Sequence, residues 1–74
     1  SYLMFLEVCE ETWINTDNVF MIEGIGKMIY SDDCKNGRAE YYLRVYSDPK
    51  TYRDIEIVSY DEIQRLESII RSLK

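Results

Sequence analysis

The chain has 74 residues, of which 46% are hydrophobic, and a formal net charge of −5. A chain of this length forms one domain with one small core, and its hydrophobic content excludes an intrinsically disordered protein. No stretch reaches the roughly 20 apolar residues that span a membrane. The absence of histidine from the sequence argues against an enzyme, since histidine is the usual general base near neutral pH and the commonest transition-metal ligand.

Charge is distributed unevenly along the chain. Residues 1–34 carry seven acidic side chains and one basic one, whereas residues 35–74 carry seven acidic and eight basic ones. Because lysine and arginine supply much of the affinity for phosphate backbones, the acidic half disfavours direct binding to DNA or RNA. It is compatible with a basic protein partner or with solubility alone.

The N-terminal run SYLMFLEVCEE has neither a basic region nor a small-residue cleavage site, so it predicts no signal peptide and a cytoplasmic protein. The two cysteines, Cys9 and Cys34, fit no CxxC pattern. They are compatible with one disulfide or with two free thiols, and a reducing compartment favours the thiols.

Short strands and a corner are predicted in the first third of the chain. In YLMFLEV, the alternation of Met4, Leu6 and Val8 with other residues predicts a strand with one face toward the core. A turn over residues 9–11 leads to a second short strand, TWIN. The following NTDN predicts a corner, because Asn and Asp side chains accept hydrogen bonds from the backbone two residues on.

The oxygen-bearing side chains between Asn15 and Glu23 raise the alternative of a cation site. An EF-hand loop needs a glycine at its sixth position and a glutamate at its twelfth. Counting from Asn15, these positions hold Phe20 and Gly26. The sequence therefore predicts a corner here rather than a metal site, and no cofactor.

The strongest turn signal in the middle of the chain is Asn36-Gly37, the preferred pair of a two-residue type I′ hairpin. A turn at this pair sets Tyr30 opposite Leu43 and Met28 opposite Val45. The apolar residues of both strands then share one side of the sheet, which supports the register.

The same register assigns the remaining side chains to two faces. Phe20, Ile22, Tyr30 and Tyr41 are expected on the side of the core. The opposite face is expected to carry tyrosine, arginine and aliphatic side chains, a composition enriched at protein interfaces. These residues are Tyr42, Arg44 and Tyr46, with Val19, Met21, Ile25 and Ile29 in the neighbouring strand.

The last part of the chain predicts a turn, a strand and a helix. SDPKT predicts a turn, and YRDIEIV predicts a strand with Ile55 and Ile57 inward. Ser59 and Glu62 have the spacing of a capping box. A helix from about residue 60 to 73 follows, because apolar residues recur there with the helical period. They are Ile63, Leu66, Ile70 and Leu73.

The predicted fold class is therefore α+β, with residues 1–74 as a single domain. An antiparallel meander of about five strands is expected to carry one C-terminal amphipathic helix packed on one face.

The stretch NTDNVFMIE has the form N-x-D-x-[IV]-x-x-I-E. Together with the preceding FLEV and the helix start SYDEI, it resembles the small FlbD-like bacterial proteins linked to flagellar or swarming functions. The strand-turn-strand is also similar to LytTR-type DNA-binding domains, whose basic DNA-contacting loops have no counterpart here. The resemblance implies a small α+β architecture. The matching residues are Asn15, Asp17, Val19, Ile22, Glu23, Glu62, Ile63 and Ile70.

The sequence predicts a non-catalytic protein-interaction or regulatory module that binds a protein partner or a second copy of itself. The expected contact residues are Tyr42, Arg44, Tyr46, Ile29 and Met21.

Two alternatives stay open. One is a regulator that binds nucleic acid by stacking bases on the aromatic row. The other is an acidic inhibitor, for instance phage-encoded, that occupies a basic nucleic-acid groove of its target. Its acidic patch would consist of Glu10, Glu11, Asp32 and Asp33.

Overall fold

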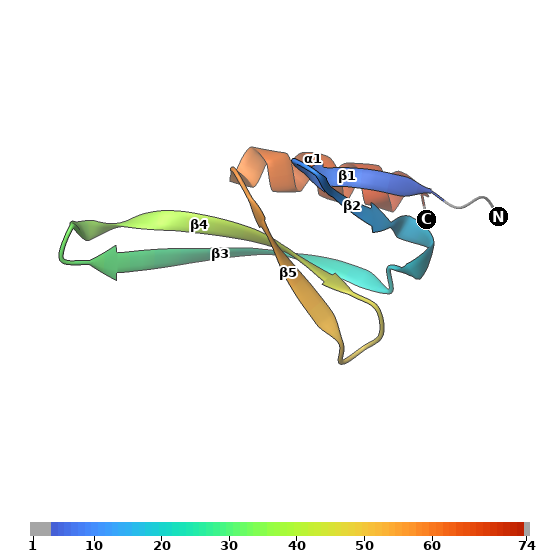
Figure 1. The fold of residues 1–74 in the computed structure, drawn as a ribbon, viewed down its shortest axis with the longest axis horizontal. Helices are drawn as coiled ribbons and strands as arrows, with labels where there is room; N and C mark the ends of the chain where they lie inside the picture. The colour runs from blue at the N-terminus through green and yellow to red at the C-terminus, as the bar shows by residue number, and fades with distance from the viewer. Residues whose placement is uncertain (1–3, 74) are drawn as a thin grey trace.

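The fold is α+β, as predicted, in a computed structural model that describes residues 4–73. Figure 1 shows the elements in chain order. They are strands β1 (Phe5–Cys9) and β2 (Thr12–Asn15), a 3-10 turn η1 (Thr16–Asn18), strands β3 (Met21–Ser31), β4 (Cys34–Tyr46) and β5 (Tyr52–Ile57), and helix α1 (Tyr60–Leu73).

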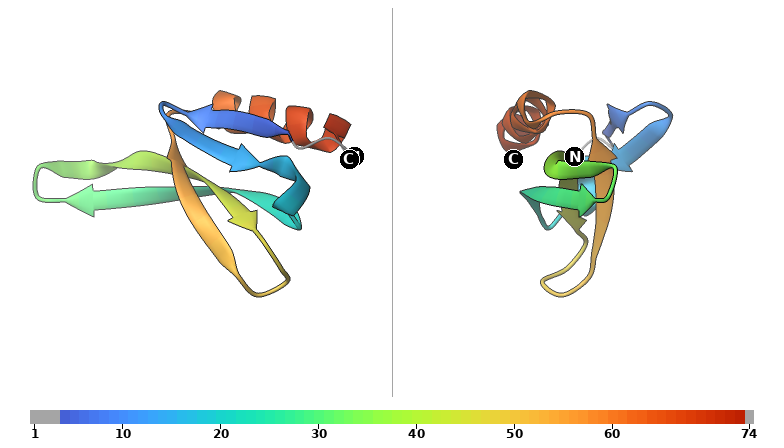
Figure 2. Two further views of the ribbon diagram at one scale, coloured as in Figure 1. Left: turned by 45° about the vertical axis from the view of Figure 1, so that its right-hand side comes forward. Right: turned by 90° about the vertical axis from the view of Figure 1, so that its left-hand side faces the viewer.

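The strands form two antiparallel sheets, so the prediction of a single meander is wrong. β1 and β2 make a two-stranded sheet, and the larger sheet has the order β3-β4-β5. The corner after β2 separates them: the Thr16 amide and hydroxyl both donate to the Met4 carbonyl, at 2.9 and 3.1 Å. These bonds turn the chain out of the first sheet before β3 begins. Figure 2 shows α1 and the β1–β2 hairpin on the same side of the larger sheet.

The core lies between the larger sheet, α1 and the β1–β2 hairpin. Burying each aliphatic side chain contributes about 1.5–3 kcal/mol relative to leaving it exposed. The buried apolar residues are Val8, Ile14, Val19, Leu43, Ile55, Ile57, Ile63, Leu66 and Ile70.

The segment just before β3 departs from the predicted faces. Val19 was expected on the face opposite the core but is buried, and Phe20 was expected in the core but is 56% exposed. The reason for Val19 is that β3 starts only at Met21, so the alternation of the strand does not extend back to it. Phe20 lines a surface groove with Ile22 and Ile70 and so stays exposed. Ile22, within the strand, packs against the core as predicted.

Helix α1 and its N-terminal cap are confirmed. The Ser59 hydroxyl accepts a hydrogen bond from the Glu62 amide at 3.2 Å, which satisfies one of the free donors of the first turn. The apolar stripe of the helix faces the core except at its last member, Leu73, which is exposed. The Glu62 carboxylate pairs with Arg65.

Strand β5 and the turn before it are also as predicted. The Asp48 carboxylate accepts hydrogen bonds from the amides of Lys50 and Thr51, both at 2.8 Å. These bonds hold the pKa of Asp48 below its ordinary value. Ile55 and Ile57 point into the core.

The hairpin between β3 and β4 turns at residues 32–33, so the predicted turn at Asn36-Gly37 is wrong. Ser31 pairs with Cys34 across the turn, and beyond an irregularity Leu43 lies opposite Gly24 rather than Tyr30. This partner lies six residues from the predicted one. Because the shift is even, the side chains within the paired strands keep their predicted faces.

Packing of the helix accounts for this register. A Cβ atom on Gly24 would lie 2.8 Å from both Ile63 Cγ2 and Glu67 Oε1, so the close approach of the helix at this position requires a glycine. Setting Gly24 opposite Leu43 places Leu43 beneath the helix, where its exposure is 0%. The tertiary contact therefore outweighs the local preference of Asn-Gly for a tight turn.

Beyond the helix, β3 and β4 continue as a two-stranded arm, defined as residues 27–40 (Figure 1). β5 pairs only with the part of β4 from Tyr41 to Tyr46, so among the described residues the arm has no third strand. The arm contributes to the elongated shape of the molecule, which measures 50 × 24 × 20 Å. On the helix side of the arm, Met28 and Tyr30 are 50% and 65% exposed. Tyr30 therefore does not enter the core as expected.

Candidate functional site

The candidate site is the open face, by which we mean the face of the larger sheet turned away from α1 and the β1–β2 hairpin. Its centre is the row predicted from the sequence: Tyr42, Arg44 and Tyr46, all in β4 and all half-buried. The register gives this row a neighbour on each side at every position. These neighbours are Ile25, Glu23 and Met21 in β3, and Glu56, Asp54 and Tyr52 in β5.

Arg44 is fixed by contacts with β5. Its Nε and Nη2 atoms donate to the two carboxylate oxygens of Asp54 at 2.8 and 2.9 Å, a bidentate geometry that orients the planar guanidinium. The guanidinium carbon also lies 4.1 Å from the centroid of the Tyr52 ring, within the range of a cation–π contact. The hydrogen bonds from Arg44 lower the pKa of Asp54, and the same bonds raise the pKa of Arg44.

Tyr46 joins the three strands on the open face. Its hydroxyl donates to Glu23 Oε1 in β3 at 2.5 Å, and its ring centroid lies 5.3 Å from that of Tyr52 in β5. The hydrogen bond to the carboxylate raises the pKa of Tyr46, because ionising the phenol would remove the donor and bring two negative charges together.

Tyr42 is held in a similar way at the other end of the row. Its hydroxyl donates to Glu40 Oε1 at 2.6 Å, and the Lys27 ammonium lies 5.1 Å from its ring centroid. This hydrogen bond raises the pKa of Tyr42 and lowers that of Glu40, and Glu40 also forms a salt bridge with Arg38 at 2.6 Å.

The open face is therefore an aromatic surface on which Tyr42, Arg44 and Tyr46 are each hydrogen-bonded to a neighbouring carboxylate. Its positive and negative charges nearly balance, so it does not form the basic track that attracts a phosphate backbone. The charged residues are Lys27, Arg38 and Arg44 against Glu23, Glu40, Asp54 and Glu56.

Of the other two predicted contact residues, only Met21 lies beside the row, opposite Tyr46. Ile29 lies opposite Arg38 in the arm, and the six-residue change in register is what separates it from the row. The sequence predicts Asp54 on the outward side of its strand, but neither Asp54 nor Tyr52 was among the predicted contact residues. The signal for them was present, because both alternate with the inward Ile55 and Ile57 and follow the short turn after the row.

The four acidic residues predicted as one patch lie in two separate turns. Glu10 and Glu11 form the turn between β1 and β2, and Asp32 and Asp33 form the tip of the arm. Figures 1 and 2 show these turns well apart. Their side chains do not make a single acidic surface.

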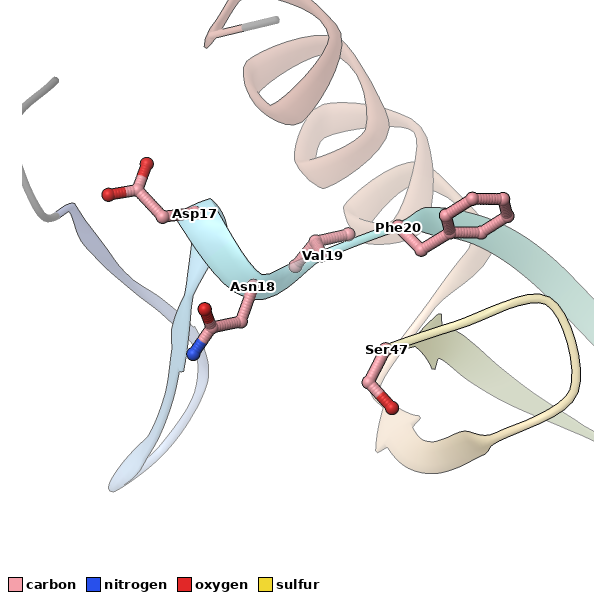
Figure 3. A pocket seen from close by; sticks show the side chains of 5 residues that line it. All are labelled: Asp17, Asn18, Val19, Phe20 and Ser47. Carbon is pink, nitrogen blue, oxygen red and sulfur yellow. The ribbon is translucent and has the colours of Figure 1, made fainter.

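The corner NTDN is confirmed as a turn, with Asn15 Oδ1 accepting from the Asp17 amide at 3.1 Å. A pocket of about 580 Å³ lies beside it, between this corner and the turn after β4. Figure 3 shows that the Asp17 carboxylate and the Asn18 amide point in different directions. Across residues 4–73, no group of three or more Cys, Asp or Glu side chains is placed to hold a metal ion.

No known protein family, curated protein or solved structure matches this chain. The resemblance to FlbD-like proteins and LytTR-type domains stays a prediction. Within the described part of the chain, no helix is long and apolar enough to cross a membrane, and Cys9 and Cys34 are free thiols.

Proposed function

We propose that this protein is a non-catalytic protein-interaction module and that the open face is its docking surface. The observation that carries the proposal is the fixed position of Arg44, which Asp54 binds through two hydrogen bonds and Tyr52 supports from one side. Tyrosine and arginine, together with tryptophan, are enriched among the residues that dominate binding energy at protein interfaces.

Pre-arranged side chains favour binding because less conformational freedom is lost when a partner docks. In the row, Tyr42, Arg44 and Tyr46 each hold a hydrogen bond before any partner is present. The near balance of charge on the open face supports a protein partner with polar and apolar groups. It gives less support to nucleic acid, whose binding requires a surplus of lysine and arginine.

The test removes the centre of the row with the double substitution Arg44→Ala/Tyr46→Ala. Protein partners are captured from the source cell with the parent chain and then compared quantitatively with the variant. Loss of two central contact residues is expected to weaken binding by roughly 30-fold or more.

The matched control is Arg53→Ala, which removes an exposed arginine from β5 on the opposite side of the sheet. Circular dichroism and urea unfolding establish that both variants keep the fold. A folded double variant that binds the same partners as tightly as the parent would show that the open face is not the docking surface.

A further inference from the structure

We propose that β3 pairs, antiparallel and edge to edge, with β3 of a second copy across a two-fold axis at Ile25. This inference extends the proposed function, because the second copy is a partner of the same sheet. It differs in the surface used, which is the edge of the sheet rather than its open face.

β3 is available for such pairing. It is 11 residues long and stands first in the order β3-β4-β5, so within residues 4–73 only one side of its backbone is bonded to another strand. An open edge presents unpaired amide and carbonyl groups that can bond to a second strand. Proteins often protect such edges with proline or with lysines that repel a second copy, but β3 has no proline and one lysine, Lys27.

The sequence of β3 is symmetric about Ile25 in chemical character. Antiparallel pairing centred on one residue sets positions at equal distances on its two sides opposite each other. Moving outward from Ile25, these positions hold Gly24 and Gly26, Glu23 and Lys27, Ile22 and Met28, Met21 and Ile29, and Phe20 and Tyr30.

The charged pair selects this register. Glu23 of each copy lies opposite Lys27 of the other, at a separation between Cβ atoms of about 4.5–5.5 Å. The two-fold axis makes this contact twice. Within residues 4–73 of one protomer, neither side chain forms a salt bridge. Registers moved by one or two residues in either direction set both charges opposite uncharged residues.

The same pairing covers exposed apolar side chains of the arm. Met28 comes to lie beside Ile22 of the second copy, and Tyr30 beside its Phe20. At that place each protomer has an apolar groove of about 370 Å³ between the start of β3 and the end of α1. The groove is lined by Phe20, Met21, Ile22, Ile70 and Arg71.

On the open face, the pairing sets Ile29 of the second copy beside Met21, which itself lies next to Tyr46. The two larger sheets then form one continuous sheet with two copies of the row. The helices lie on the same side of this sheet, because paired residues of antiparallel strands point to the same face.

The experiment is a charge exchange followed by sedimentation equilibrium and light scattering. Lys27→Glu sets like charges opposite each other at both positions, and so does Glu23→Lys. Each variant alone is expected to dissociate at least about tenfold more readily than the parent dimer. Mixed in equal amounts, the two variants are expected to form a heterodimer, because every charge again meets its opposite.

A second measurement reads the register directly. In a Cys9→Ser/Cys34→Ser background, Ile25→Cys is expected to form a disulfide between copies, because residues at the axis face each other at a distance of about 4.5–5.5 Å between Cα atoms. The control Ile29→Cys is expected not to form one, since Ile29 faces Met21 of the second copy.

A parent chain that stays monomeric at all concentrations, or a dimer that withstands both charge reversals, would overturn the edge pairing. Those results do not decide the proposed function, which is tested separately by the binding of a different protein to the Arg44→Ala/Tyr46→Ala variant, with Glu23 and Lys27 left in place. Conversely, a β3-paired dimer whose partner binding is unaffected by that double variant would refute the proposed function and keep the edge pairing.

Discussion

Gly37 shows how one residue shapes the arm. Its φ of +82° lies in the left-handed region, and a Cβ atom there would lie 2.7 Å from Tyr30 Cε1 and 2.8 Å from Met28 Cε. The glycine of the Asn-Gly pair is thus needed for its backbone conformation, although the pair does not form the hairpin turn. The glycine allows the irregularity in the pairing of β4 with β3, and it leaves room for the side chains of Met28 and Tyr30 above the backbone of β4.

We predict that Gly37→Ala lowers the free energy of unfolding by about 1–2 kcal/mol, because an L-residue is strained at positive φ. The measurement is urea unfolding at the lowest practical protein concentration. Gly26→Ala is the control, since its Cβ would meet Tyr41 at an ordinary 3.6 Å and its φ is not positive. Equal losses in both variants would contradict this role of Gly37.

At the scale of elements, the helix was predictable because its signals are local. Ser59, Glu62 and the apolar period that follows lie within one short stretch, and they specify the start and the buried side of α1. The register of β3 and β4 was not predictable in the same way. It depends on the contact between Gly24 and Ile63, which are far apart in the sequence.

The candidate site was predictable in part: the sequence predicted which residues share a face, but not which residues lie beside them in the neighbouring strands. The alternation along β4 was enough to place Tyr42, Arg44 and Tyr46 on one face, because a shift by an even number of residues preserves the faces. The neighbours of the row follow from the exact pairing of strands, which is why Ile29 was misplaced and Asp54 was not placed beside Arg44.

The cap of α1 gives a prediction at this scale. Ser59→Ala removes the acceptor of the Glu62 amide and is expected to lower stability by about 0.5–2 kcal/mol. Thermal unfolding followed by circular dichroism measures the loss. Ser68→Ala, an exposed serine within the helix, serves as the control and should be neutral or slightly stabilising, since alanine is the better helix former. A variant at Ser59 as stable as the parent would mean that water replaces the cap.

At the scale of the whole molecule, hydrogen bonds at the surface make stability depend on pH in two directions. Folding lowers the pKa of Asp54 and Glu40 and raises that of Tyr42 and Tyr46. The carboxylates therefore contribute stability above their unfolded pKa of about 4, and this is lost as pH falls through their folded pKa. The tyrosines contribute below about pH 10, and this is lost as pH rises through their raised pKa.

We predict a plateau of stability between these two ranges, measured as the urea midpoint against pH. Asp54→Asn is expected to reduce the fall of the urea midpoint at low pH, which we call the acid limb, because the variant has no carboxylate to protonate at that position. Glu56→Gln, which changes a neighbouring carboxylate that forms no salt bridge among residues 4–73, is the control. An acid limb equally steep in the parent and in Asp54→Asn would contradict the assignment.

The division into two sheets has a consequence for how the molecule opens. Among residues 4–73, no strand of the β1–β2 sheet is hydrogen-bonded to a strand of the larger sheet; Val8 and Ile14 of the hairpin join the common core through side-chain packing. The hairpin can therefore detach by exposing these side chains while the β3-β4-β5 ladder stays intact. Such partial openings need less free energy than global unfolding. Amide protons of β1 and β2 should then exchange with solvent sooner than those around Leu43. The small sheet would therefore open more often than the larger sheet, although the two share one hydrophobic core.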